Sequence, residues 1–317
     1  LELAEITGRD REFGTVDSRR PDVIDDGLRV AIVRDANRDV LGTLVNFGNH
    51  VELLWDKNLE LTADVAGYAR RGLEVGLVYD GKLRRAGLGG TALWLTGNIG
   101  GLVTTPPEIA VEDPISGDRF ADPSFEKARA QGHAIAAAVL DEVAAGGFVA
   151  SRATELRTHV RDLDLPLANV PLVLGSALGL LDREVSFSWG FETASEVALI
   201  EIGDLWIACI PGELYPEIAV GGIERPPGAD LDVEPVETPP LRPAMRGQVN
   251  MMVNLANDAI GYLIPRSQWD ADAPWLYGSE EETYGEIVSA GPDTAGQVHG
   301  ALLELFAEAG AAPGGPP

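Results

Sequence analysis

The sequence predicts an α/β fold in which helices are layered on a mixed β-sheet. Strand-like and helix-like segments are intermixed along the chain, and they do not follow the strict strand–helix–strand alternation of an all-parallel sheet. The chain has 317 residues, 45% of them hydrophobic, which suffices for one large domain or two modest ones. We expect one domain over residues 1–309 and a flexible tail at 310–317.

The first half of the chain carries alternating strand and helix signals. Residues 1–27 are polar and predict turns. Beyond them, β-branched segments predict strands and apolar residues at helical spacing predict helices. Thr62 and Asp64 are placed to cap the first helix, and Ser124 the second. The expected elements are a hairpin, a helix, a strand and an Ala-rich helix, at Leu28–Arg34 with Val40–Phe47, 65–77, 91–95 and 124–145.

The second half predicts a second group of strands and a C-terminal helix. Residues 224–243 are rich in proline and acidic residues and predict a loop. Residues 256–261 predict a turn. The other expected elements are an exposed strand, a hairpin, a short helix, a further strand and an amphipathic helix, at 154–165, 194–202 with 205–210, 213–220, 248–255 and 293–309.

Charge and composition exclude several classes of protein. The net charge is −26, and such a surface repels nucleic-acid phosphates and anionic lipid headgroups. We therefore expect no nucleic-acid partner. Cys209 is the single cysteine, which excludes an internal disulfide and a cysteine-rich zinc site. No stretch approaches the roughly 18 apolar residues of a membrane-spanning helix, so none is expected.

Three side chains with metal-binding chemistry each follow a strong strand signal: His50, Glu213 and Tyr262. Imidazole and carboxylate suit Zn²⁺, and a bound metal ion favours ionisation of a phenol. Each residue also has an ordinary structural role open to it. His50 can be hydrogen-bonded at a strand end, Glu213 can complement a helix dipole, and Tyr262 can belong to the core. The spacing leaves both possibilities open.

Five segments resemble, in order, segments of the catalytic domain of neutral/alkaline non-lysosomal ceramidases. The first resembles the family's Asn-His-Pro segment, the second its Ser-x-Asp-x-x-Gly-Tyr helix start and the third its Asn-x-Gly-Asp-Val-Ser-Pro loop. The fourth resembles Pro-Gly-Glu, and the fifth Asn-x-Tyr-x-x-Tyr with the Tyr-Glu…Gly-Pro that follows. The segments are NFGNHVE at 46–52, LTADVAGYARRGLE at 61–74, LTGNIGGLVT at 95–104, IPGELYPE at 210–217, and NLANDAIGYLIP at 254–265 with 278–296.

The resemblance implies a zinc-dependent hydrolase of an N-acyl bond, acting on a small-molecule or lipid substrate. His50, Glu213 and Tyr262 would correspond to zinc ligands, although Ala259 also occupies a family tyrosine position. Asp64 would hold the site in place from outside the ligand set, or only cap its helix. The family is often exported, so a secreted or cell-surface location is expected slightly ahead of a cytoplasmic one.

The loop of the third segment supplies two further candidate catalytic positions, Asn98 and Gly100. Its glycines would let backbone N–H groups approach a substrate oxyanion, or would only form a tight turn. The family's Asp and Ser fall at Gly101 and Val103 in this chain. That departure favours an alternative function, a hydrolase of the same fold acting on a non-lipid amide or ester.

Two further departures concern the ends of the resemblance. The family's earlier His-Thr-His-Ser-Gly-Pro segment has no counterpart before His50, and the C-terminal β-sandwich of the family is absent. The resemblance therefore implies either that the N-terminal part lies outside this chain or that the site lacks one ligand. The second possibility gives a third expectation, a truncated or degenerate domain without catalysis.

Overall fold

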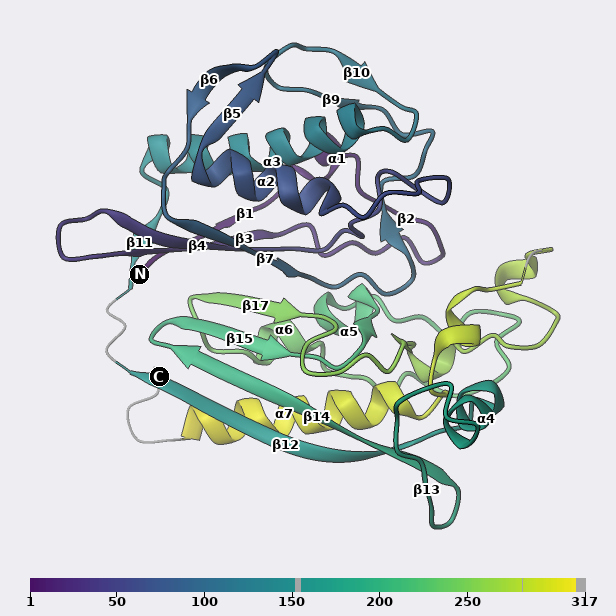
Figure 1. Cartoon of the computed structure of the whole chain (residues 1–317). Helices are drawn as coiled ribbons and strands as arrows, with labels where there is room; N and C mark the ends of the chain where they lie inside the picture. Colours follow the sequence, from purple (N-terminus) through teal and green to yellow (C-terminus); the bar gives the residue numbers. More distant parts are fainter. Residues whose placement is uncertain (152–154, 281, 312–317) are drawn as a thin grey trace. The chain divides into compact units, whose positions relative to one another are not determined.

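The computed structural model describes residues 1–151, 155–280 and 282–311. The chain forms two compact units, each assembled from several segments (Figure 1). Unit 1 comprises Leu1–Ser18, Asp26–Gly97 and Val103–Thr154, and unit 2 comprises Arg19–Asp25, Asn98–Leu102 and Glu155–Pro317. Each unit contains strands and helices, which confirms the predicted α/β class.

Unit 1 is built on a five-stranded mixed sheet with the strand order β11-β1-β3-β4-β7. Its neighbours are antiparallel except β4 and β7, which are parallel. Two helices, α2 and α3, pack together on one face of the sheet (Figure 1). The bounds are β1 Glu2–Ile6, β3 Leu28–Arg34, β4 Val40–Phe47, α2 Asp64–Glu74, β7 Thr91–Thr96, α3 Phe125–Ala145 and β11 Val149–Ala150.

Smaller elements complete unit 1. They are a one-turn helix and three two-stranded antiparallel pairs. Their bounds are α1 Asp10–Phe13, β2 Val16–Asp17 with β8 Val103–Thr104, β5 Gly76–Tyr79 with β6 Lys82–Ala86, and β9 Val111–Glu112 with β10 Arg119–Phe120.

Helix α3 is fixed at its N-terminal end by a cap and by a buried lysine. The Ser124 hydroxyl accepts a hydrogen bond from the Lys127 backbone N–H, which confirms the predicted cap. The Lys127 ammonium is buried and donates to the carbonyls of Pro106 and Ala121, both at 2.8 Å, and of Pro107 at 3.3 Å. Burial lowers the pKa of this lysine. The ammonium thus ties the loop before α3 to the helix.

A buried acid–imidazole pair joins α3 to the loop after β9. The His133 ring nitrogen Nδ1 lies 3.4 Å from an Asp113 carboxylate oxygen. Burial alone would raise the pKa of Asp113, but hydrogen bonds from His133 and from the backbone N–H groups of Ile115 and Ser116 outweigh it. The pKa of Asp113 is lowered to about 2.

Unit 2 is built on a sheet with the strand order β12-β14-β15-β17, and β13 extends it beside β14. β15 and β17 are parallel, and the other pairs are antiparallel. Helix α7 packs against β12 and β14. The bounds are β12 Leu156–Pro166, β13 Ser186–Phe187, β14 Phe191–Ile202, β15 Leu205–Cys209, β17 Val249–Val253 and α7 Thr294–Ala311.

Short elements complete unit 2. A second parallel pair, β16 with β18, lies among them. The bounds are α4 Val170–Ala177, β16 Glu213–Leu214, α5 Pro216–Val220, α6 Leu241–Ala244 and β18 Tyr262–Leu263, with 3₁₀ turns at Arg266–Gln268, Leu276–Gly278 and Gly285–Val288.

Most predicted elements are confirmed, with shifts of a few residues at their ends. Two expectations differ from the structure. Residues 1–27 contain strand β1, which pairs with β3, and the predicted helix at 213–220 begins only after the short strand β16. Thr62 and Asp64 stand at the start of α2, where the Thr62 hydroxyl accepts from the Asp64 N–H at 3.0 Å. Residues 154 and 312–317 of the predicted strand and tail lie outside the described residues. Among the described helices, none is long and apolar enough to cross a membrane.

Candidate functional site

Glu213 and Tyr262 are direct neighbours in the parallel pair β16–β18 of unit 2. The Glu213 N–H donates to the carbonyl of Gly261 at 2.9 Å, and the Tyr215 N–H donates to that of Leu263 at 3.3 Å. Residues in register on adjacent parallel strands are about 5 Å apart and point to the same side of the sheet. The structure therefore brings together two of the three candidate side chains, a carboxylate and a phenol.

Two glycines make this pairing possible. At Gly212 a Cβ would lie 2.5 Å from the carbonyl oxygen of Gly261, so only glycine allows the two segments to approach so closely. Gly261 has a φ of +85°, and a Cβ there would lie 1.7 Å from the carbonyl oxygen of Val288. The turn at 256–261 is held by bonds from the Ile260 N–H to the Pro211 carbonyl, at 2.9 Å, and from the Leu255 N–H to the Gly212 carbonyl, at 3.2 Å. Turn chemistry thus sets the register of the pair.

The Tyr262 side chain is almost fully buried, with 3% exposed. Its ring is contacted edge-on by those of Tyr215 and Tyr284, with centroids 6.0 and 5.9 Å away. Burial raises the pKa of Tyr262 far above its usual value, and the neighbouring Glu213 carboxylate, to which the phenol is hydrogen-bonded, adds to the effect. The hydroxyl is therefore protonated near neutral pH, and only a nearby cation would favour its ionisation.

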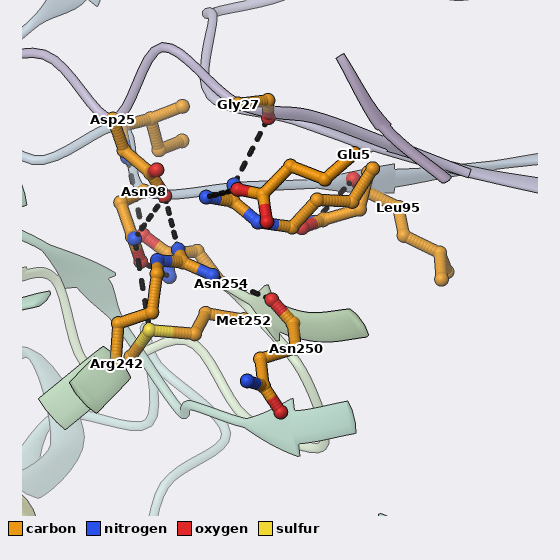
Figure 2. Close-up of polar contacts among 12 residues, drawn as sticks. Glu5, Asp25, Gly27, Leu95, Asn98, Arg242, Asn250, Met252 and Asn254 are labelled. Carbon is orange, nitrogen blue, oxygen red and sulfur yellow. Dashed lines mark hydrogen bonds and ion pairs between the residues drawn. The ribbon is translucent and has the colours of Figure 1, made fainter. Parts of the chain in front are cut away.

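The predicted candidate Asn98 is a fully buried structural link in unit 2. Its Nδ2 donates to Asp25 Oδ2 at 2.8 Å, and its Oδ1 accepts from Asn254 Nδ2 at 3.1 Å (Figure 2). Asn254 Oδ1 in turn accepts from the backbone N–H groups of Leu214, at 2.8 Å, and Ile99, at 3.2 Å. Asn254 therefore attaches both the 98–102 loop and strand β16 to the end of β17.

Asp25, which accepts from Asn98, belongs to a buried ion pair. Asp25 is paired with Arg242, whose guanidinium also donates to the Asn250 carbonyl at 2.5 Å. The Met252 sulfur lies 3.9 Å from Asn98 Nδ2, so Asn98 meets polar and soft partners on several sides (Figure 2). This network positions the loop beside Glu213.

Gly100 packs directly against strand β16. A Cβ at this position would lie 2.4 Å from Tyr215 Cδ1 and 2.6 Å from the Glu213 carbonyl oxygen. The Gly100 N–H donates to the Leu214 carbonyl at 3.0 Å. The donor that was expected to face a substrate oxyanion is therefore engaged within the protein in this structure. Gly100 shapes the site by lacking a side chain.

The other two predicted residues, His50 and Asp64, belong to unit 1. His50 follows β4 and its backbone N–H donates to the Val103 carbonyl at 2.9 Å. The buried Asp64 carboxylate accepts from the backbone N–H groups of Val65 at 2.6 Å and Leu54 at 3.0 Å. This geometry matches the helix-start role that the sequence left open for Asp64, and its role beside a metal stays a prediction.

The oxygen pair Glu213–Tyr262 fits part of a metal site. Within the described residues, no group of three or more His, Cys, Asp or Glu side chains is arranged to hold a metal ion. The remaining histidines have partners of their own. His133 faces Asp113 at 3.4 Å, His159 lies 2.7 Å from Glu201, and His299 lies 2.8 Å from the Pro239 carbonyl oxygen. His50 as the nitrogen ligand of a metal site stays a prediction.

Sequence reasoning missed three side chains that surround the Glu213–Tyr262 pair. The Arg19 guanidinium stacks on the Tyr215 ring at 4.0 Å and pairs with Glu217 at 2.5 Å. Glu217 is fully buried and also accepts from Gln268 Nε2 at 3.0 Å. Tyr215 and Glu217 lie within the quoted segment IPGELYPE, so that segment marked the region. Arg19 comes from a polar stretch with no distinctive pattern.

Comparison with known proteins establishes the fold. No protein-family model matches the chain, and no curated protein matches it in sequence. Among solved structures, it resembles the neutral ceramidase from Pseudomonas aeruginosa, with a TM-score of 0.57 and 17% identity over 89% of this chain and 46% of that one. It also resembles a ceramidase complexed with C2, with a TM-score of 0.59 and 16% identity over 96% of this chain and 52% of that one. The chain spans about half the length of each.

Proposed function

Taking this ceramidase-like fold as the premise, we propose that the chain is a hydrolase domain that cleaves an N-acyl (amide) bond with the help of zinc. The observation that supports the proposal most is the registered pair Glu213 and Tyr262. A carboxylate beside a buried phenol, at the end of short strands whose turns hold them in register, is a suitable oxygen donor set for zinc. The fold neighbours named as ceramidases supply the reaction class.

We propose His50 as the nitrogen ligand that completes the set of three protein ligands. When bound by these residues, zinc would supply the Lewis acidity that polarises an amide carbonyl and activates water for hydrolysis. Asp64 is proposed to support the ligands from unit 1. The protein's own contribution is rigidity, because the Asn254 bonds to Leu214 and Ile99 fix the backbone on which Glu213 is carried.

Tyr262 has a second role in this proposal. Burial keeps its hydroxyl protonated in the absence of a cation, so the group is able to donate a hydrogen bond to Glu213 and to hold that carboxylate in place. The flanking rings of Tyr215 and Tyr284 exclude water from one side of the phenol. Polar contacts gain strength where water is excluded.

One observation favours an alternative. Gly101 and Val103 stand where the resembling family has Asp and Ser, which favours a non-lipid amide or ester as substrate. A domain that retains the fold without catalysis is the remaining alternative. The same resemblance leads us to propose a secreted or cell-surface location slightly ahead of a cytoplasmic one.

A substrate panel tests the proposal and separates these alternatives. Purified chain would be incubated with zinc and either N-acyl sphingosines or short N-acyl amino acids, and the released fatty acid measured. We expect Glu213→Gln and Tyr262→Phe to lower the rate at least 100-fold, about the loss seen when a group that acts on the transition state is removed. Turnover of only the short amides would assign the non-lipid alternative.

Matched control variants exist on the surface. Tyr79→Phe removes a solvent-exposed hydroxyl in unit 1, and Glu234→Gln removes an exposed carboxylate that pairs with Arg225. Both variants should retain full activity. Unchanged activity in Glu213→Gln would reject the proposed site, and the absence of turnover of both substrate classes would assign the non-catalytic alternative.

A further inference from the structure

One end of unit 2 exposes an apolar surface that the described residues of the unit leave uncovered. Helix α4 is apolar in composition yet has no buried residue, whereas a helix that is apolar all round is ordinarily buried. Trp189, in the turn between β13 and β14, is fully exposed at 103%. We call this surface the apolar face; its exposed side chains are Val170, Leu174, Leu178, Leu180, Phe187 and Trp189.

The two parts of the apolar face lie next to each other. The Leu167 N–H, just before α4, donates to the carbonyl of Phe191 at 2.8 Å. Phe191 pairs with Phe187 across the hairpin, and their rings are 5.2 Å apart. Helix α4 and the β13 hairpin accordingly project at the same end of unit 2 (Figure 1).

The apolar face is uncharged in a strongly acidic protein. Residues 167–181 and 185–191 contain no ionisable side chain, while the whole chain has a net charge of −26. Between these segments, Arg183 is paired with Asp258, while Asp182 and Glu184 are exposed acidic residues at the border of the apolar face. Long-range repulsion between two copies of so acidic a chain opposes self-association through this surface, and it equally opposes an anionic partner. The complementary partner is apolar and electrically neutral.

Contacts within unit 2 connect the apolar face to the candidate site. Asn169, the cap of α4, donates from Nδ2 to the carbonyls of Ile287 and Ser289, both at 2.9 Å. Ile287 is exposed. In the same segment, the Tyr284 ring packs edge-on against that of Tyr262. Segment 284–289 therefore contacts both the cap of α4 and the Tyr262 ring.

We propose that the apolar face docks onto the surface of an electrically neutral lipid bilayer. Tryptophan and other aromatic side chains favour the membrane–water interface, and burying exposed apolar area provides the binding free energy. An eight-residue helix is about 12 Å long, so α4 can enter the interface but cannot cross the bilayer. Docking itself does not depend on the proposed hydrolase function. The purpose of docking, to bring a lipid substrate to the site, rests on that proposed function.

Vesicle binding tests the docking surface without reference to activity. The full chain would be sedimented with phosphatidylcholine vesicles and with vesicles that also contain phosphatidylglycerol. We expect Phe187→Ser/Trp189→Ser to weaken binding at least tenfold, and phosphatidylglycerol to weaken it further at low salt. The control Leu59→Ser/Leu61→Ser removes two exposed leucines of unit 1 and should bind like the parent. Equal binding by both double variants, or binding only to anionic vesicles, would overturn the proposal.

Two further measurements separate the other outcomes. If light scattering shows a dimer that Phe187→Ser/Trp189→Ser dissociates, and the parent does not bind vesicles, a second copy covers the apolar face and the proposal fails. For its use in catalysis, the same variant should lose activity toward vesicle-embedded N-acyl lipid and keep it toward a soluble short-chain amide. If no variant turns over either substrate, the proposed function fails, while the sedimentation result still decides whether the face docks.

Discussion

Replacing Asn254 by leucine should strongly destabilise unit 2, because one buried amide holds three partners. Its Oδ1 accepts from Leu214 N–H at 2.8 Å and Ile99 N–H at 3.2 Å, and its Nδ2 donates to Asn98 Oδ1 at 3.1 Å. A buried polar group left without a partner costs about 1–3 kcal/mol. Because Asn254→Leu would leave three such groups, we expect a loss of about 3–6 kcal/mol in the free energy of unfolding.

Urea unfolding monitored by tryptophan fluorescence measures this loss, since Trp206 is buried in the core of unit 2. Amide exchange of residues 205–214 would assign the transition to that unit. The matched control is Asn250→Leu in strand β17, which Asn254 follows; the Asn250 Nδ2 makes one bond, to the Gly247 carbonyl at 3.1 Å. It should cost only about 0.5–1.5 kcal/mol. A loss below about 1 kcal/mol for Asn254→Leu would refute the view that this residue holds β16 in place.

Three further perturbations probe other parts of the account by urea unfolding. Gly261→Ala should lower the free energy of unfolding by more than about 3 kcal/mol, because its Cβ would meet a backbone carbonyl. The control Gly117→Ala is also at positive φ but has open space around it, and it should cost about 1 kcal/mol. Equal losses in the two variants would contradict the steric argument. The depressed pKa of Asp113, about 2 against a usual 3.8, should contribute about 2 kcal/mol above pH 4 that is lost as pH falls from 4 to 2, and Asp113→Asn should lack this dependence. Lys127→Met leaves three carbonyls without their ammonium donor and should cost about 2–4 kcal/mol, with no loss contradicting its anchoring role.

The elements that the sequence predicted well are those with a local signal. Leu28–Arg34 and Val40–Phe47 have the predicted bounds because β-branched residues flank a clear turn. Ser124 caps α3 because a capping hydroxyl needs only the next three residues. Strand β1 was missed because its five residues, ELAEI, include two acidic ones and its pairing partner, β3, lies more than 20 residues away.

The candidate site depends on contacts that no local pattern reveals. β16 and β18 are two residues long, too short for any periodicity, and their register is set by turns at Gly212 and Gly261. The resemblance singled out Asn98 and Gly100 but not their partners. Asn254 and Leu214 are more than 110 residues distant in sequence. For that reason only the structure shows that the Gly100 N–H donates to the Leu214 carbonyl.

The most direct test of the central claim is zinc stoichiometry, measured by calorimetric titration of the metal-free chain and by mass spectrometry of the loaded protein. We predict one zinc ion per chain in the parent and in His159→Ala, a control histidine that pairs with Glu201. His50→Ala, Glu213→Gln and Tyr262→Phe should each bind zinc at least tenfold more weakly, because each lacks one of three ligands. Equal zinc affinity in all four variants, or no zinc in the parent, would contradict the claim that these three side chains form a metal site.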